Sequence, residues 1–127
     1  MKKTIRIIGV PLDLGQSHRG VDMGPGALRY AGLSERLSRI GYEIQDLGNL
    51  NVPIREALGE EQSLNFLPSV QSVCAAAYQA GVKAMRDKTI PIFLGGDHSL
   101  AIGSIGGVTH YEPAGVIWVD AHGDFNT

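Results

Sequence analysis

The stretch TIPIFLGGDHSLAIGS, residues 89–104, decides the fold that we expect for this chain. Residues 89–94 form a short apolar run, which predicts a β-strand. The pair Gly95 and Gly96 closes that strand, and the composition of residues 99–110 then favours a helix, although a weak one. A strand that leads through a tight turn into a helix is typical of α/β proteins.

The same alternation continues in both directions from this stretch. Residues 68–88 repeat small apolar side chains at helical spacing, and residues 115–119, GVIWV, predict another strand. The other predicted elements are a strand at 4–10, a helix from Pro25 to about Gly41, a strand at 42–48 and a loop at 49–65.

Alternating strands and helices predict an α/β fold with a parallel sheet and helices on both faces, because parallel strands need crossover connections. The strands at 89–94 and 115–119 are almost continuously apolar, so we expect both to be buried on two sides. Ligands of such sheets bind beyond the carboxyl ends of the strands. The candidate functional residues should therefore follow these strands.

Composition excludes several classes of protein. The chain has 127 residues, of which 43% are hydrophobic and 19% charged, as in one soluble globular domain. A net charge of −2 with scattered basic residues argues against a nucleic-acid partner, and no apolar run is long enough to cross a membrane. The single cysteine, Cys74, falls in an alanine-rich helical pattern and is expected in the core. These features predict a cytoplasmic protein.

Two motifs with metal-ligand chemistry follow the predicted strands. The first contains Asp97 and His98, and the second, VDAHGDFNT at residues 119–127, places Asp120, His122 and Asp124 at alternate positions. In an extended segment those three side chains share one side, and His98 would approach them if the two strands are neighbours. Histidines and carboxylates without cysteine favour a divalent ion such as Mn²⁺ over a thiolate zinc site.

Each motif also has a purely structural interpretation. GGDH is commonly a tight turn with a helix cap, in which Asp97 would accept backbone N–H groups. Three potential ligands at the end of a buried strand have few structural reasons to occur, because unpaired carboxylates there repel each other. The two motifs together therefore favour the metal site.

The same motifs resemble those of a known family. GGDHSLAIGS and VDAHGDFNT resemble the first two signature motifs of the arginases, the manganese-dependent ureohydrolases. Residues 9–33, GVPLDLGQSHRGVDMGPGALRYAGL, are similar to the N-terminal strand, loop and helix of arginases. The resemblance covers nearly the whole chain and is weakest at residues 49–65. It implies the N-terminal part of one three-layer αβα domain that lacks its C-terminal half.

The resemblance implies a role for each residue of the motifs. His98 would bind the first of two Mn²⁺ ions, Asp120 would bridge both, and His122 would bind the second. Asp124 would be another ligand of the first ion and would pass a proton to the leaving amine, while Asp97 would orient its neighbours. The two ions would lower the pKa of a shared water, giving the hydroxide that attacks the guanidinium carbon of L-arginine and yields L-ornithine and urea.

The substrate rests on fewer residues. In arginases the position of Asn126 helps to hold the α-carboxylate of L-arginine, which agmatine lacks, although Asn126 also suits a turn. His18 and Arg19 either line the same crevice or are solvated loop residues. An agmatinase or guanidinobutyrase, and a non-catalytic arginase-like fragment that binds a partner, are the alternatives.

The ligand count predicts that part of the site is missing. Two ions need more than the four ligand side chains of the two motifs. The family supplies the rest from a later aspartate-rich motif, with a glutamate, a histidine and a serine, all expected beyond Thr127. We therefore expect the N-terminal part of an arginase, inactive alone, whose complete form is a homo-oligomer, a trimer or hexamer.

Overall fold

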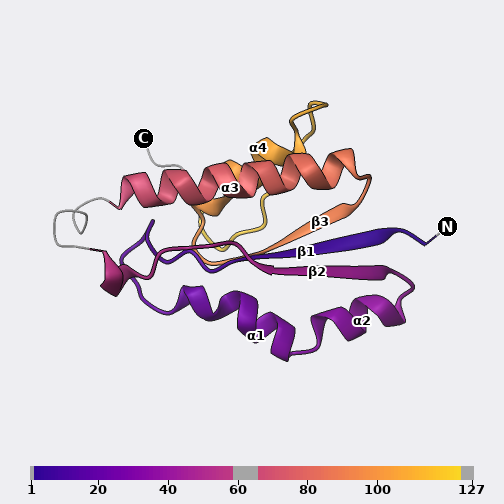
Figure 1. The fold of residues 1–127 in the computed structure, drawn as a ribbon, viewed down its shortest axis with the longest axis horizontal. Helices are drawn as coiled ribbons and strands as arrows, with labels where there is room; N and C mark the ends of the chain where they lie inside the picture. The colour runs from indigo at the N-terminus through magenta and orange to yellow at the C-terminus, as the bar shows by residue number, and fades with distance from the viewer. Residues whose placement is uncertain (1, 59–65, 124–127) are drawn as a thin grey trace.

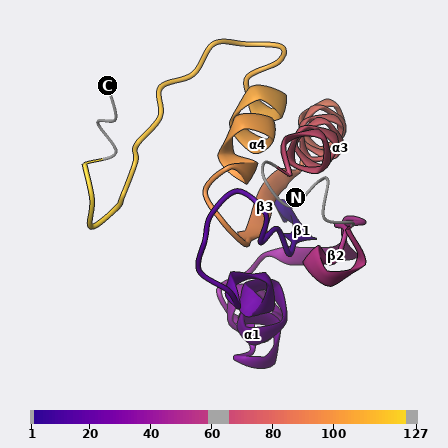
Figure 2. The ribbon, with the colours of Figure 1, turned by 90° about the vertical axis from the view of Figure 1, so that its left-hand side faces the viewer.

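A three-stranded parallel sheet with the order β2-β1-β3 forms the centre of the computed structural model, which describes residues 2–58 and 66–123 (Figure 1). Helices α1 and α2 cover one face of the sheet, and α3 and α4 cover the other (Figures 1 and 2). The predicted α/β fold with helices on both faces is confirmed. The elements are β1 (Thr4–Val10), η1 (Val21–Met23), α1 (Gly24–Tyr30), α2 (Leu33–Arg39), β2 (Glu43–Asn49), η2 (Arg55–Ala57), α3 (Leu67–Arg86), β3 (Ile90–Gly95) and α4 (Leu100–Val108).

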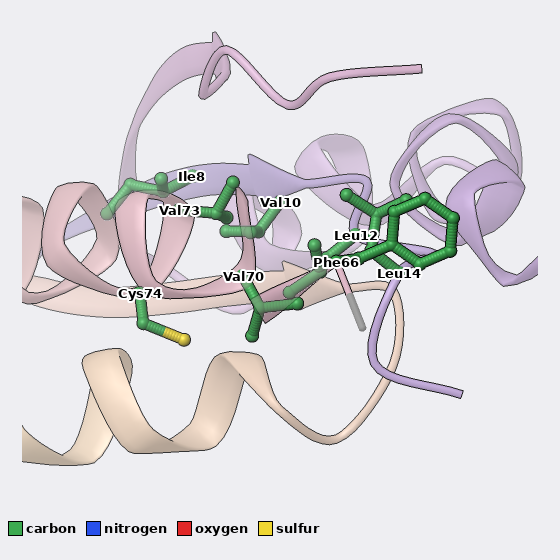
Figure 3. Packing of buried hydrophobic residues seen from close by; sticks show 8 residues of the cluster. All are labelled: Ile8, Val10, Leu12, Leu14, Phe66, Val70, Val73 and Cys74. Carbon is green, nitrogen blue, oxygen red and sulfur yellow. The ribbon is translucent and has the colours of Figure 1, made fainter. Parts of the chain in front are cut away.

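Strand β1 is the central strand, and apart from Arg6 its buried side chains are apolar on both faces. It pairs in parallel with β2 on one side and with β3 on the other. Ile5 and Ile7 point to the face covered by α2, whereas Ile8 and Val10 point to α3, as alternation along a strand requires. Figure 3 shows the second of these faces, where β1 and the residues after it meet the start of α3: Ile8, Val10, Leu12, Leu14, Phe66, Val70, Val73 and Cys74.

Helices α3 and α4 approach each other closely along a row of small residues. A Cβ atom on Gly103 would overlap the carbonyl oxygen of Cys74, and one on Gly107 would overlap that of Tyr78. Cys74 is buried as predicted, its thiol donates to the carbonyl oxygen of Ser99 at 3.1 Å, and burial raises the pKa of that thiol. None of the described helices is both long and apolar enough to cross a membrane.

Two predictions about local structure need correction. The single helix predicted from Pro25 to Gly41 is two helices, because Gly32 takes a left-handed conformation with φ 82° between α1 and α2. Strand β3 was expected to be buried on both faces, but only Leu94 is buried and Ile90 is 40% exposed. The second difference arises because β3 pairs with β1 alone among the described strands.

The prediction of a strand at residues 115–119 is wrong. These residues form no strand in the structure, and Ile117 and Val119 are each 93% exposed. A strand needs hydrogen bonds from a neighbouring strand, whereas this segment runs apart from the described sheet (Figure 2). Its apolar, β-branched composition alone is therefore insufficient to make it a strand.

The α3–α4 contact predicts the effect of a single methyl group. Gly103→Ala should lower the free energy of unfolding by about 1–3 kcal/mol, because the new Cβ meets backbone that cannot rotate away. Gly26→Ala is the matched control: nothing lies within 4 Å of a Cβ at this helical position. Alanine there should be neutral or stabilise by up to about 1 kcal/mol. Urea unfolding followed by circular dichroism measures both, and equal effects would contradict this account of the packing.

An ion pair at the amino end of β1 predicts a loss of stability in acid. Arg6, whose side chain is 8% exposed, donates to Asp87 at 2.8 Å, and this hydrogen bond lowers the pKa of the Asp87 carboxyl. Because the folded pKa lies below the unfolded value of about 4, the pair stabilises the fold above that pH. Its contribution disappears as the pH falls through the folded pKa. Urea midpoints measured between pH 6 and pH 3 should fall less steeply for Asp87→Asn than for the parent.

Candidate metal centre

The turn between β3 and α4 lies at the carboxyl end of the sheet, directly beside the chain that leaves β1. A Cβ on Gly96 would overlap the backbone of Leu12, so only glycine permits this close approach. The backbone N–H of Asp97 donates to the carbonyl oxygen of Leu12 at 2.8 Å. The position at which the sequence predicts a ligand-binding crevice is thus built from two strand ends in contact.

Asp97 is buried at this junction and accepts hydrogen bonds from both sides of it. Its Oδ2 accepts the N–H of Gly15 at 2.8 Å, and its Oδ1 accepts the N–H of Ser99 at 3.0 Å as well as the Ser99 hydroxyl. The structural interpretation is confirmed in part: the carboxylate of Asp97 accepts backbone N–H groups in a tight turn, but α4 begins without a side-chain cap. The same contacts hold the residues on either side of His98.

His98 meets the second motif through Asp120. The Nε2 of His98 lies 3.3 Å from Asp120 Oδ2, and the Nδ1 of His122 lies 3.1 Å from Asp120 Oδ1. The side chain of Asp120 is only 10% exposed, while those of the two histidines are 66% and 84% exposed. The hydrogen bond from the His122 backbone N–H, at 2.8 Å, lowers the pKa of Asp120, with further contributions from both imidazoles.

Trp118 flanks the same histidine. Its ring centroid lies 5.5 Å from that of His98, with the two planes at 83°. An open hollow of about 480 Å³ lies beside this pair, and its lining residues are His98, Ser99, Ala101, Ile102, Ile105 and Trp118. The imidazole of His98 is thus bordered by an aromatic edge on one side and by the Asp120 carboxylate on another.

The structure therefore brings together three of the predicted ligands. Asp120 contacts both His98 and His122, whereas Asp124 and Asn126 lie outside the described residues. The expected extended geometry is wrong, because the N–H of His122 folds back onto Asp120 in a local turn. Within residues 2–58 and 66–123, no three or more histidine, cysteine or acidic side chains are arranged so that they could hold one metal ion.

The donor atoms fit divalent-ion chemistry in pairs. Adjacent ligands of an octahedral ion with bonds of about 2.1 Å lie about 3.0 Å apart, close to the 3.3 Å between His98 Nε2 and Asp120 Oδ2. Asp120 presents one oxygen to each imidazole, as a carboxylate shared by two ions would. Imidazole nitrogens with carboxylate oxygens suit a divalent metal ion.

The loop after β1 contains polar contacts that sequence reasoning missed. Asp13 is buried, which tends to raise the pKa of its carboxyl, but hydrogen bonds from Arg19, Gly20 and Gln16 outweigh burial and lower it. Arg19 also donates to Glu56 at 2.5 Å, so its side chain links the loop to η2. His18 is exposed. An acidic residue between two leucines at the end of an apolar strand is the signal that could have indicated Asp13.

Comparison with known proteins identifies the family. Residues 3–127 match the model of the arginase family. The chain belongs to this family. It is 51% identical over 128 residues to the arginase of Bacillus subtilis (strain 168), an alignment that covers 100% of this chain and 43% of that protein. The native crystal structure of Bacillus caldovelox arginase has a TM-score of 0.87 at 49% identity and matches all of this chain and 43% of that one.

An agmatine ureohydrolase of known structure is less similar to this arginase-family chain. The crystal structure of the Thermoplasma volcanium enzyme has a TM-score of 0.60 at 25% identity, and covers 84% of this chain and 34% of that one. The chain spans less than half the length of the arginases that it matches. The expected resemblance to the N-terminal portion of an arginase is therefore confirmed.

Proposed function

We propose that this chain supplies part of the binuclear manganese centre of an arginase, which hydrolyses L-arginine to L-ornithine and urea. The observation that carries the proposal is the Asp120 carboxylate, which directs one oxygen to His98 and the other to His122. A carboxylate placed between two imidazoles is suited to hold two ions at once. The membership of the arginase family supports the same reaction.

Each residue then has a distinct role. His98 and Asp120 would hold the first ion and Asp120 and His122 the second, while Asp97 would orient His98 through its hydrogen bonds to the same turn. When bound, the two Mn²⁺ ions lower the pKa of water and so make a nucleophile available at neutral pH. From the family resemblance we propose Asp124 as a further ligand that passes a proton to the leaving amine.

L-Arginine is the proposed substrate in preference to agmatine. The higher identity and TM-score of the arginases support it, as does the family role of Asn126 in holding the α-carboxylate. An agmatinase or guanidinobutyrase remains the alternative within this class of hydrolases. We also propose that the complete protein is a trimer or hexamer. We propose further that this chain by itself is inactive, because three or four ligand side chains do not fill the coordination shells of two ions.

Manganese binding tests the centre directly. Trp118 is the only tryptophan in the sequence and lies against His98, so bound paramagnetic Mn²⁺ should quench its fluorescence. The purified chain should show weak, saturable quenching for at most one ion, reversed by EDTA. Asp120→Asn removes the central negative charge and should weaken binding by about 10-fold or more.

Glu43→Gln is the matched control for that titration. It removes the same charge from the amino end of β2, the opposite end of the sheet, and should leave Mn²⁺ affinity unchanged. Quenching that is absent, or that is equal in the parent and Asp120→Asn, would argue against the metal centre.

Urea release tests the reaction and the substrate. The chain alone should release no urea from L-arginine in the presence of Mn²⁺. When it replaces the matched portion of Bacillus subtilis arginase, the resulting protein should release urea from L-arginine at least about 10-fold faster than from agmatine. Faster release from agmatine would favour the agmatinase alternative, and release by the chain alone would disprove its inactivity.

A further inference from the structure

Arg55, the first residue of η2, reaches across to the loop that follows β1. Its Nη2 donates to the carbonyl oxygens of Asp13 at 2.6 Å and Gln16 at 2.9 Å. Its guanidinium lies 4.8 Å from the centroid of the Phe66 ring, which packs on one side of it. The guanidinium of Arg55 thus binds two residues of the loop at once, and the Phe66 ring packs against it.

Glu56, the residue next to Arg55, also binds this loop, through the side chain of Arg19. Glu56 accepts a hydrogen bond from Arg19, and Arg19 in turn donates to the buried carboxylate of Asp13 at 3.0 Å. Segment 55–56 therefore binds the loop in two ways. Arg55 donates to backbone carbonyl oxygens of the loop, and Glu56 forms an ion pair with Arg19. Two fixed ends leave residues 13–19 little freedom to shift.

The part of the loop between Asp13 and Gln16 contacts the candidate metal centre. Gly15 lies between the two residues held by Arg55, and its N–H donates to Asp97 Oδ2. A Cβ on Gly15 would lie 2.6 Å from the Ser99 hydroxyl oxygen, so the loop passes close to the residue after His98. A continuous series of contacts thus leads from Arg55 through Gly15 and Asp97 to the turn that carries His98.

We infer that Arg55 is a positioning residue for His98. It fixes the loop at Gly15, and the loop then holds Asp97 and Ser99 on either side of that histidine. The inference rests on the proposed metal centre, because its consequence is the direction in which His98 presents Nε2 to Asp120. A lysine does not reproduce this arrangement, because its ammonium lacks the planar guanidinium that lies over the Phe66 ring while Nη2 donates to both carbonyl oxygens.

Direct binding of substrate by Arg55 is a poorer explanation of these contacts. Nη2 is occupied by the two backbone carbonyls, and Nε is buried without a hydrogen-bond partner among the described residues. A cation beside the loop would also repel the guanidinium of L-arginine. The side chain therefore acts on the shape of the loop and not on the reacting group.

Mn²⁺ titration of the 127-residue chain tests this role, with free Mn²⁺ measured by electron paramagnetic resonance. Arg55→Lys keeps the charge and should weaken Mn²⁺ binding by about 5- to 10-fold, near the low end for residues that orient a ligand. In the metal-free protein it should also speed hydrogen exchange at the Gly15 amide and shift the ring resonances of His98. Arg55→Ala should give the same changes to a greater degree.

Arg6→Ala is the control for stability. Arg6 is also an arginine whose side chain joins two elements, through Gln45 and Asp87, but it lies at the amino end of β1. This variant should lower the urea midpoint without changing Mn²⁺ affinity or the His98 resonances. Measurements are made where circular dichroism shows each variant folded, so that unfolding does not imitate a loss of affinity.

The outcomes separate the inference from the proposed function. If the parent binds no Mn²⁺, the metal centre fails, and the Gly15 exchange and His98 resonances still decide whether Arg55 positions that turn. If the parent binds and Arg55→Lys binds equally well, the inference is wrong. It is also wrong if Arg6→Ala weakens binding as much as Arg55→Lys, because the effect would then follow from stability alone.

Discussion

The buried carboxylate of Asp97 joins the two strand ends on which the candidate centre depends. It accepts hydrogen bonds from Gly15 in the loop after β1 and from Ser99 at the start of α4. A buried carboxylate without such donors would be strongly destabilising, so the loop and the turn must form together. Gly96 permits their approach, because any side chain there would overlap Leu12. The place of His98 follows from these contacts.

The two halves of the candidate centre differ in how firmly they are held. His98 follows a strand and lies in a turn that the hydrogen bonds of Asp97 hold, whereas Asp120 and His122 lie on an irregular segment whose local contact is their own turn. Trp118 and the Asp120 carboxylate provide the contacts across to His98. Ligands on irregular segments are less precisely placed than ligands on regular elements, which is the reason to expect weak binding by this chain alone.

Sequence reasoning succeeded where local pattern determines structure and failed where pairing does. The strand at 4–10 and the long helix α3 were predictable from apolar spacing, and the parallel sheet followed from their alternation. The segment at 115–119 has the composition of a strand but no neighbouring strand in the described sheet. Gly32 looked like one more helical residue, yet its positive φ divides the predicted helix in two.

The sequence by itself determined the layer architecture, the kinds of donor atom and the two motifs that carry them. These properties depend on residue type and on short spacings along the chain. Only the tertiary structure decided that Asp120 lies between two imidazoles and that Arg55 donates hydrogen bonds to a loop about 40 residues earlier in the chain. Such partners are chosen by packing, because many cations and carbonyls could pair in the unfolded chain and the folded backbone brings only a few within reach.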